Sequence, residues 1–280
     1  MFGLIKIPGI FRAVSPIYHG GNEKTGAVAL MNRIKFIIED EPLDIPVING
    51  NAIRGVLRRM AFADFLNRVN YALDVSKKSG QRLYHAFFSG GALETVDESS
   101  SGVIDLKFKK KVVENIPPAR LFGFSYGNQI IESKLKIGFA LPICRELKDY
   151  LPNSVSSTVS FYDLLSQVFQ TRRDELRVER EEDEHAVQML VEYEVYSPGT
   201  RFYHEIRIED PDPIDKACLS HIISLWIEKP YIGGKSSVGL GEIEINYDTA
   251  GLGDGTPYLN FLEEKKAEIV ATLTELEGVT

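Results

Sequence analysis

The sequence is poor in the features that mark several classes of protein. Its 280 residues include only two cysteines, Cys144 and Cys218, which are too few and too far apart for a zinc cluster. No apolar run approaches the roughly 18 residues that a membrane-spanning helix needs. The segment from Met1 to Pro8 lacks the long apolar stretch of a signal peptide. We therefore expect a cytoplasmic protein with no membrane partner.

Known catalytic signatures are missing as well. The five histidines are scattered, and the sequence has no HExxH motif, no nucleophile elbow and no cysteine–histidine pair of useful spacing. We therefore expect no catalytic residue, no metal site and no cofactor. The hydrophobic fraction of 44% and the charged fraction of 26% are those of an ordinary globular protein, which excludes a disordered or collagen-like chain.

An excess of positive charge, typical of nucleic-acid-binding proteins, is also absent, since the net charge is -8. The charges are nevertheless distributed unevenly. Acidic runs lie at Glu179–Glu184 and Asp210–Asp215, and basic clusters lie at Arg54–Arg59, Lys107–Lys111 and Arg172–Arg177. A local basic field can attract an anion whatever the average, so the net charge does not exclude a nucleic-acid partner.

The order of the expected strands and helices indicates an α+β protein. Alternating β-branched residues predict the strands, and apolar stripes predict the helices. The elements are a strand at Ile10–Ile17, a helix from Asn51 to about Val69, two strands at Val187–Tyr196 and Thr200–Ile208 joined as a hairpin by Ser197–Thr200, a helix from Asp212 and a strand at Glu242–Tyr247. This β-α-β-β-α-β order is ferredoxin-like (RRM-like), with an antiparallel sheet against two helices.

We expect three regions along the chain. A ferredoxin-like palm comprises residues 1–74 and 187–250, residues 75–186 form a long insertion with finger and thumb elements, and residues 251–280 form a C-terminal helix packed on the palm. Further expected elements are a strand at Ala27–Ile38, little periodic structure over Val75–Ile104, an exposed basic strand at Lys107–Val113, a helix at Phe161–Gln170, a charged protrusion at Thr171–Glu184 and a helix at Tyr258–Leu276.

The segment Gly233–Gly241 carries the sharpest chemical signal. Its four glycines leave the backbone free to adopt positive φ and let N–H groups approach an anion closely. A lysine and two serines add a cation and two hydroxyls, so a phosphate backbone is the expected ligand. The candidate RNA contacts here are Gly233, Gly234, Lys235, Ser236 and Ser237. The alternative is a plain flexible turn.

The same segment imitates the end of a P-loop. A P-loop needs another glycine five positions before Gly234, and Lys229 stands there instead. The expected order of helix, loop and strand is also the reverse of the P-loop order. We therefore reject nucleotide hydrolysis.

The helix expected at Asn51 is a second candidate site. Its apolar residues recur with helical spacing and predict one buried face. Arg54 and Arg58 are four residues apart and would share a different, exposed face, with Arg59 beside them. With Asn51 as N-cap, the helix N-terminus and the arginines would hold phosphate through N–H groups and charge together. A solvated basic face is the alternative.

Two further groups of residues are candidate RNA contacts. Arg172, Arg173 and Arg177 would form an arginine-dense tip able to grip a strand, or a salt-bridged hairpin in solvent. His19 and Lys24 lie in a first glycine-bearing loop, His19–Gly26.

These segments together resemble the CRISPR-associated RAMP superfamily, and within it the repeated backbone subunit that coats guide RNA in multisubunit effector complexes. The matching segments are His19–Gly26, Asn49–Arg58, Ala119–Gly123 and Gly233–Gly241. The resemblance implies a ferredoxin-like palm that binds the sugar-phosphate chain of guide RNA (crRNA) and a thumb that wedges between its bases. It also implies head-to-tail assembly of copies of the chain, other effector subunits as partners, and a target nucleic acid bound by base pairing.

The sequence departs from the family pattern at two places. The helix start reads Asn51-Ala52-Ile53-Arg54-Gly55 where the family often has Ser-x-x-Lys-Gly, and arginine keeps the charge. Target-cutting members carry an aspartate before this helix, to which neither Asp40 nor Asp44 clearly corresponds. We therefore expect a non-cleaving subunit, resembling those of type IV systems.

Two other functions remain open. The chain could be a RAMP endonuclease that processes guide or slices target, using His19 or a carboxylate such as Asp40 with a metal. It could also be a structural partner protein that uses its acidic surface and binds no RNA.

Overall fold

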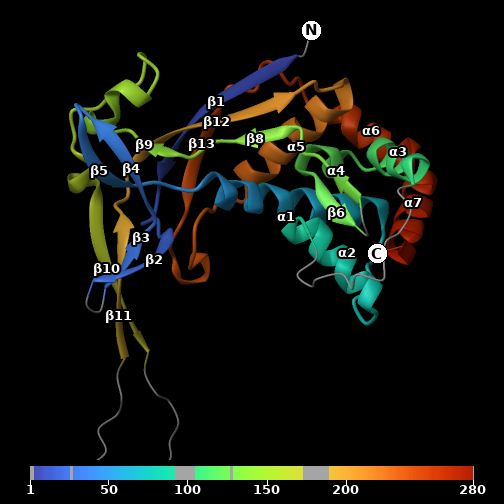
Figure 1. Cartoon of the computed structure of the whole chain (residues 1–280), viewed down its shortest axis with the longest axis horizontal. Helices are drawn as coiled ribbons and strands as arrows, with labels where there is room; N and C mark the ends of the chain where they lie inside the picture. Colours follow the sequence, from blue (N-terminus) through green and yellow to red (C-terminus); the bar gives the residue numbers. More distant parts are fainter. Residues whose placement is uncertain (1–2, 26–27, 92–104, 127–128, 173–188, 280) are drawn as a thin grey trace, which may run out of the picture.

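The computed structural model describes residues 3–25, 28–91, 105–126, 129–172 and 189–279. The two largest sheets and a group of helices are distinct in Figure 1. Within the described residues, no helix combines the length and apolar character needed to cross a bilayer.

The larger sheet forms the palm. Its hydrogen-bonded order is β13 (Ile243–Tyr247), β1 (Leu4–Ala13), β12 (Arg201–Glu209) and β8 (Leu135–Ile137), and the short β9 (Leu141–Pro142) also pairs with β12. Every pairing in this sheet is antiparallel. With α1 (Gly50–Val69) after β1 and α5 (Pro213–Glu228) after β12, the order is the ferredoxin-like β-α-β-β-α-β. The α+β, ferredoxin-like prediction is confirmed.

One face of the palm sheet is packed against these two helices. Along β1 the buried residues alternate with exposed ones, and Phe11 stacks on Phe202 of β12 with ring centroids 5.1 Å apart. Trp226 of α5 meets Phe11 edge-on at 6.3 Å. Leu57 of α1 is buried in the same core. The alternation of period two on the strands and the apolar stripe on the helices thus meet in one core.

The second palm strand is not the one expected. Val187–Tyr196 and Thr200–Ile208 were expected to pair as a hairpin, but β11 (Met189–Tyr196) pairs with β10 (Leu165–Arg172), and β12 pairs with β8 instead. The turn between β11 and β12, with Gly199 at φ +90°, moves the chain from one sheet to the other. The palm sheet therefore includes β8 and β9, which lie within the range expected to be the insertion.

The smaller sheet carries the thumb. Its order is β10, β11, β3 (Val28–Met31) and β2 (Gly20–Thr25), and β11 runs parallel to β3. In Figure 1 the paired ends of β10 and β11 extend away from the rest of the chain. The charged protrusion expected at Thr171–Glu184 lies, beyond Arg172, outside the described residues. The helix expected at Phe161–Gln170 is wrong: a single turn of 3-10 helix, Phe161–Leu164, leads into β10.

Two more predictions in the N-terminal part are corrected. The segment His19–Gly26, expected to be a loop, is largely β2, whose pairing with β3 contains a register shift between Gly20 and Lys24. The strand expected at Ala27–Ile38 is divided into β3 and β4 (Arg33–Ile38), and β4 forms a hairpin with β5 (Glu41–Pro46). A second small core lies beneath this hairpin and includes Phe36.

A layer of helices covers the far end of α1. These helices are α2 (Lys78–Ser89), α3 (Leu106–Asn115), α4 (Pro117–Phe122), α6 (Thr256–Glu264) and α7 (Lys266–Val279). Part of Val75–Ile104 is thus the ordered helix α2, and the basic strand expected at Lys107–Val113 is α3, capped by Asp105. The C-terminal helix is two helices that contribute Tyr258 and Leu273 to the main core.

Short elements complete the described chain. They are β6 (Phe124–Tyr126), β7 (Gln129–Ile131) and two further 3-10 turns, Arg145–Tyr150 and Ser236–Val238.

Candidate nucleic-acid interface

Helix α1 begins where a strand of the palm sheet crosses it. Its N-cap is Asn49, whose side-chain oxygen accepts a hydrogen bond from the backbone N–H of Asn51 at 2.8 Å, so the expectation that Asn51 is the N-cap is wrong by two residues. A Cβ at Gly50 would lie 2.4 Å from the carbonyl oxygens of Ile137 and Gly138. Glycine at this position therefore lets the helix start against β8 and directs its first turn to the surface.

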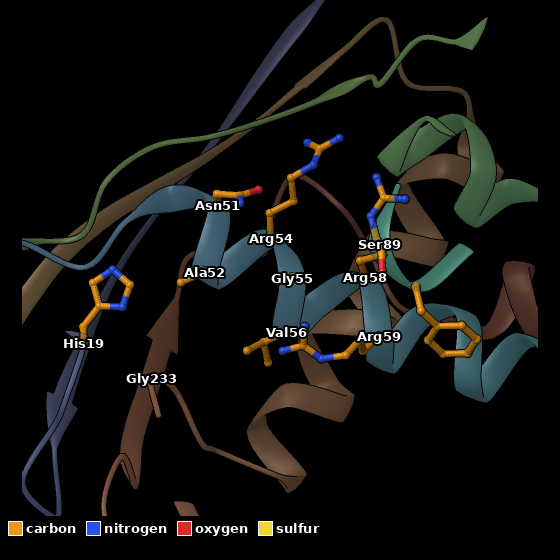
Figure 2. Close-up of a pocket in the computed structure, with 11 residues that line it drawn as sticks. His19, Asn51, Ala52, Arg54, Gly55, Val56, Arg58, Arg59, Ser89 and Gly233 are labelled. Carbon is orange, nitrogen blue, oxygen red and sulfur yellow. The ribbon is translucent and has the colours of Figure 1, made fainter. Parts of the chain in front are cut away.

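A surface pocket of about 400 Å³ lies beside this first turn. Figure 2 shows residues from four segments around it: His19, the first turns of α1, Ser89 at the end of α2, and Gly233. The described residues that line it are His19, Asn51, Ala52, Arg54, Gly55, Val56, Arg58, Arg59, Phe88, Ser89 and Gly233. Three of these are arginines and none is an aspartate or glutamate. The pocket therefore offers an anion a positive field, although the net charge of the whole chain is -8.

The glycine segment reaches this pocket through a close backbone contact. Gly233 has φ +79°, and a Cβ there would lie 2.4 Å from the carbonyl oxygen of Tyr18. The N–H of Gly234 donates to that same oxygen at 2.9 Å. The segments that contain His19 and Gly233, more than 200 residues apart in sequence, are thereby held side by side.

Arg58 is not on an exposed face, which corrects that expectation. Only 6% of the residue is exposed. Its Nη2 donates to the carbonyl oxygens of Phe122 at 2.7 Å and Gly123 at 2.8 Å, at the C-terminus of α4. Its Nη1 reaches two carbonyl oxygens in the last turn of α2, each at 3.4 Å. The guanidinium thus donates to carbonyl groups at the C-terminal ends of two helices, where a positive charge is favourable.

Arg54 is half-buried and also contacts backbone. It donates to the carbonyl oxygens of Leu135, at 3.2 Å, and Phe122. The ring of Phe122 lies within 6 Å of both guanidinium carbons, at 5.9 Å for Arg54 and 5.6 Å for Arg58. Burial lowers the pKa of Arg54, and burial together with the charge of Arg54 lowers the pKa of Arg58 to about 10. Both side chains therefore remain charged at neutral pH.

Arg59 is the exposed arginine of the three. Figure 2 shows its side chain on another side of α1 from those of Arg54 and Arg58, directed toward Val56. Its guanidinium lies over Gly55, where a Cβ would come within 3.2 Å of Nη1. Among the described residues it has no ion-pair or hydrogen-bond partner, so its donors are available to a ligand.

His19 connects the first segment to the helix start. Its Nε2 accepts a hydrogen bond from the backbone N–H of Asn49 at 3.2 Å, which requires the proton of the neutral ring to be on Nδ1. Burial lowers its pKa, so the ring is neutral at pH 7. A neutral His19 can contact RNA as a hydrogen-bond donor through Nδ1 but adds no charge to the pocket.

Lys235 is held by the base of the thumb. Its ammonium lies 4.2 Å above the ring of Tyr193 on β11 and donates to Oε1 of Gln170 on β10 at 3.3 Å. Tyr18 packs edge-on against the same Tyr193 ring, 4.9 Å away. This cluster ties the glycine segment to the thumb. Ser236 and Ser237 are exposed on the turn that follows.

Two other expected contacts, Lys24 and Arg172, belong to the smaller sheet. The backbone of Lys24 pairs with Ala29 in the smaller sheet, and Arg172 ends β10 opposite Met189. Arg173 and Arg177 lie outside the described residues, and their roles stay predictions. Asp40 and Asp44 lie on the hairpin of β4 and β5, and neither lines the pocket. Among the described residues no group of three His, Cys, Asp or Glu side chains is placed to hold a metal ion.

Sequence reasoning missed the contribution of α2. Phe88 and Ser89, at the C-terminus of that helix, line the pocket opposite α1. The available signal was the helical spacing of the apolar residues Leu83, Ala86 and Phe87, which are buried in the structure.

A model of the RAMP superfamily matches residues 10–244. The chain belongs to the RAMP superfamily. The resemblance drawn from the glycine and arginine segments is thus confirmed. This RAMP chain shares its fold with a chain of a solved Type IV-B CRISPR Complex, with a TM-score of 0.62 and 20% sequence identity, over 87% of this chain and 90% of that chain. A comparison with curated proteins found no match.

Proposed function

We propose that this RAMP chain is a guide-RNA-binding backbone subunit of a multisubunit CRISPR effector complex. The observation that carries the proposal is the pocket at the start of α1, where arginines, a helix N-terminus and a glycine backbone converge without a carboxylate among the described lining residues. That combination suits a phosphate group of an RNA backbone. The RAMP family and the fold shared with a chain of a Type IV-B CRISPR Complex support an effector role.

In this proposal the RNA is read by base pairing and the protein holds its sugar-phosphate chain. Arg59 contacts a phosphate directly, and the N-terminus of α1 and Gly233 offer the backbone. Arg54 and Arg58 add positive charge from beneath the pocket surface, and their hydrogen bonds to backbone hold the shape of the pocket. Copies of the chain assemble head-to-tail along one guide, together with other effector subunits, and present the exposed bases to a target nucleic acid. The chain performs no cleavage and needs no cofactor.

The binding claim is tested by fluorescence polarisation with two unrelated RNAs of equal length over a range of salt concentrations. We expect similar affinities for both RNAs and a steep loss of affinity with salt, because phosphate contacts release counterions. The variant Arg59→Gln should weaken both RNAs and lower the salt slope by about one phosphate contact. Arg201→Gln, which removes the same charge from an exposed position on β12, is the matched control. Equal effects of the two variants would reject the pocket as the RNA site.

Assembly and chemistry need separate experiments. Light scattering of the chain with guide RNAs of increasing length should give multimers whose copy number rises with RNA length, and a constant stoichiometry of one would reject head-to-tail assembly. Incubation with labelled RNA with and without Mg²⁺ should leave the RNA intact. Specific cleavage that is lost in His19→Ala or Asp40→Ala would show the endonuclease alternative instead.

A further inference from the structure

Helix α2 carries an aromatic stack that begins in the basic pocket. The ring of Phe88, which lines the pocket, stacks on Tyr84 one turn earlier, with centroids 4.6 Å apart and planes 27° from parallel. Tyr84 is 43% exposed, and Phe88 is half-buried. Phe88 packs against the main core on one side, whereas Tyr84 lies outside that core. The stack therefore presents an open aromatic surface next to a site with positive charge.

The position of this stack is fixed by the surrounding packing. Beneath it, Phe62 of α1 stacks on Phe87 with centroids 4.5 Å apart, and Phe62 also meets Phe88 at 6.4 Å. At the C-terminus of α2, Arg58 donates to the carbonyl oxygens of Ala86 and Phe87. The guanidinium that contributes to the pocket field thus also anchors the helix that bears the stack. A rigid platform of this kind costs little to order when a ligand binds.

We propose that Tyr84 and Phe88 form a base-stacking platform for one unpaired nucleotide of the bound RNA. Every nucleobase has a π face that can stack on an aromatic ring, so the platform accepts any base. A phosphate at Arg59 and the N-terminus of α1 would place the attached nucleoside beside Phe88, because both groups line the same pocket. The inference rests on the proposed function, since the base belongs to the RNA whose phosphate the pocket holds.

The chemistry of the two neighbouring surfaces favours a nucleic acid over an apolar partner. An apolar peptide would cover Tyr84 and Phe88 but would leave the adjacent arginines without an anion. A nucleotide supplies an anion and a flat aromatic group, joined by a sugar, and so matches both surfaces at once.

The test uses the full chain and uridine-rich RNAs that carry a single 2-aminopurine at successive positions. In the wild-type complex we expect strong quenching of 2-aminopurine fluorescence at one position, or at regularly spaced positions if several copies bind. Tyr84→Phe keeps the ring and should keep the quenching. Tyr84→Leu keeps apolar volume without a ring. It should remove the quenching and weaken affinity roughly 5- to 150-fold, the range expected for loss of one base–aromatic stack.

Three outcomes separate this inference from the proposed function. Salt-dependent binding that is sensitive to Arg59→Gln but shows no quenching, or quenching that persists in Tyr84→Leu, would overturn the platform and leave the guide-binding function intact. Absence of RNA binding by the wild-type chain would overturn both. A second measurement needs no variant: replacing the quenched nucleotide by an abasic one should reduce wild-type affinity more than the same replacement elsewhere, and equal effects would also overturn the platform.

Discussion

Arg58 and Arg59 are neighbours in sequence with opposite environments, and exchanging each for methionine separates their roles. Arg58→Met keeps an unbranched side chain of similar length but removes every donor. The carbonyl oxygens of Phe122 and Gly123 then lose their short hydrogen bonds of 2.7 and 2.8 Å. A hydrogen bond to a charged group contributes about 1.5–3 kcal/mol, so the two together are worth about 3–6 kcal/mol. The two contacts at 3.4 Å to α2 add little to this sum.

Urea unfolding followed by circular dichroism measures this loss. We expect a lower midpoint at an unchanged slope for Arg58→Met, because the folded and unfolded states expose the same surface as in the wild type. Arg59→Met should unfold within about 0.5 kcal/mol of the wild type, since Arg59 is exposed. Its RNA affinity should nevertheless fall. Coincident unfolding curves for the two variants would refute the conclusion that the hydrogen bonds of Arg58 to the end of α4 stabilise the fold.

Three further predictions concern the palm and the glycine segment. Burial lowers the pKa of His204 from 6.5 to about 4, so the unfolded chain binds more protons than the folded chain between these pH values. The free energy of unfolding should therefore fall by about 3 kcal/mol as pH drops through this range. His204→Gln should flatten the pH dependence of the urea midpoint, and a pH dependence equal to that of the wild type would contradict this. Gly233→Ala should reduce stability and RNA affinity more than Gly239→Ala, because both residues have positive φ but only at Gly233 would a Cβ meet backbone, at 2.4 Å from Tyr18 oxygen; equal thermal shifts would argue against a close contact. Asp215→Asn should lower the free energy of unfolding by about 3–5 kcal/mol, because the buried carboxylate pairs with Arg120 and, at 2.6 Å, with Lys134. Glu209→Gln, in the exposed pair with Lys136, should lower it by less than about 1 kcal/mol in the same unfolding assay.

Local signals were sufficient for the two palm helices. Asp212 and Pro213 start α5 as expected, and Asp215 completes a capping box with Asp212. The apolar spacing that begins at Ile53 predicted α1 to its last residue, Val69. These features depend on contacts within one or two turns, which is why the sequence alone contains them.

Strand partners depend on distant residues and were beyond the same reasoning. The alternation in Val187–Tyr196 is that of a strand in any sheet, and it carries no sign that β11 pairs with β10 and β3. The true second palm strand, β8, lies within Ser133–Pro142, whose alternation predicts a strand but carries no sign that it pairs with β12. The ferredoxin-like order was therefore correct, while one of its strands was assigned to the wrong segment.

The candidate site was likewise predictable from the sequence only in part. His19, Arg54 and Gly233, which were candidate RNA contacts in separate segments of the sequence, line one pocket. The burial of Arg58 was not expected, because an arginine that caps helix ends has the same sequence signature as one that faces solvent. Its environment is set by α2 and α4, which lie 28 to 65 residues further along the chain.

The way Arg58 is buried also explains how an acidic chain can keep a basic pocket. Carbonyl dipoles offset the loss of hydration around the guanidinium but carry no net charge, so they do not cancel its positive charge. With its pKa lowered only to about 10, Arg58 still contributes a full charge at neutral pH. A carboxylate partner would have stabilised the arginine equally well but would have cancelled the field, as Asp215 does for Arg120. Pairing with backbone therefore lets the same residue hold the fold together and attract an anion, and removing it should weaken RNA binding even under conditions where the variant remains folded.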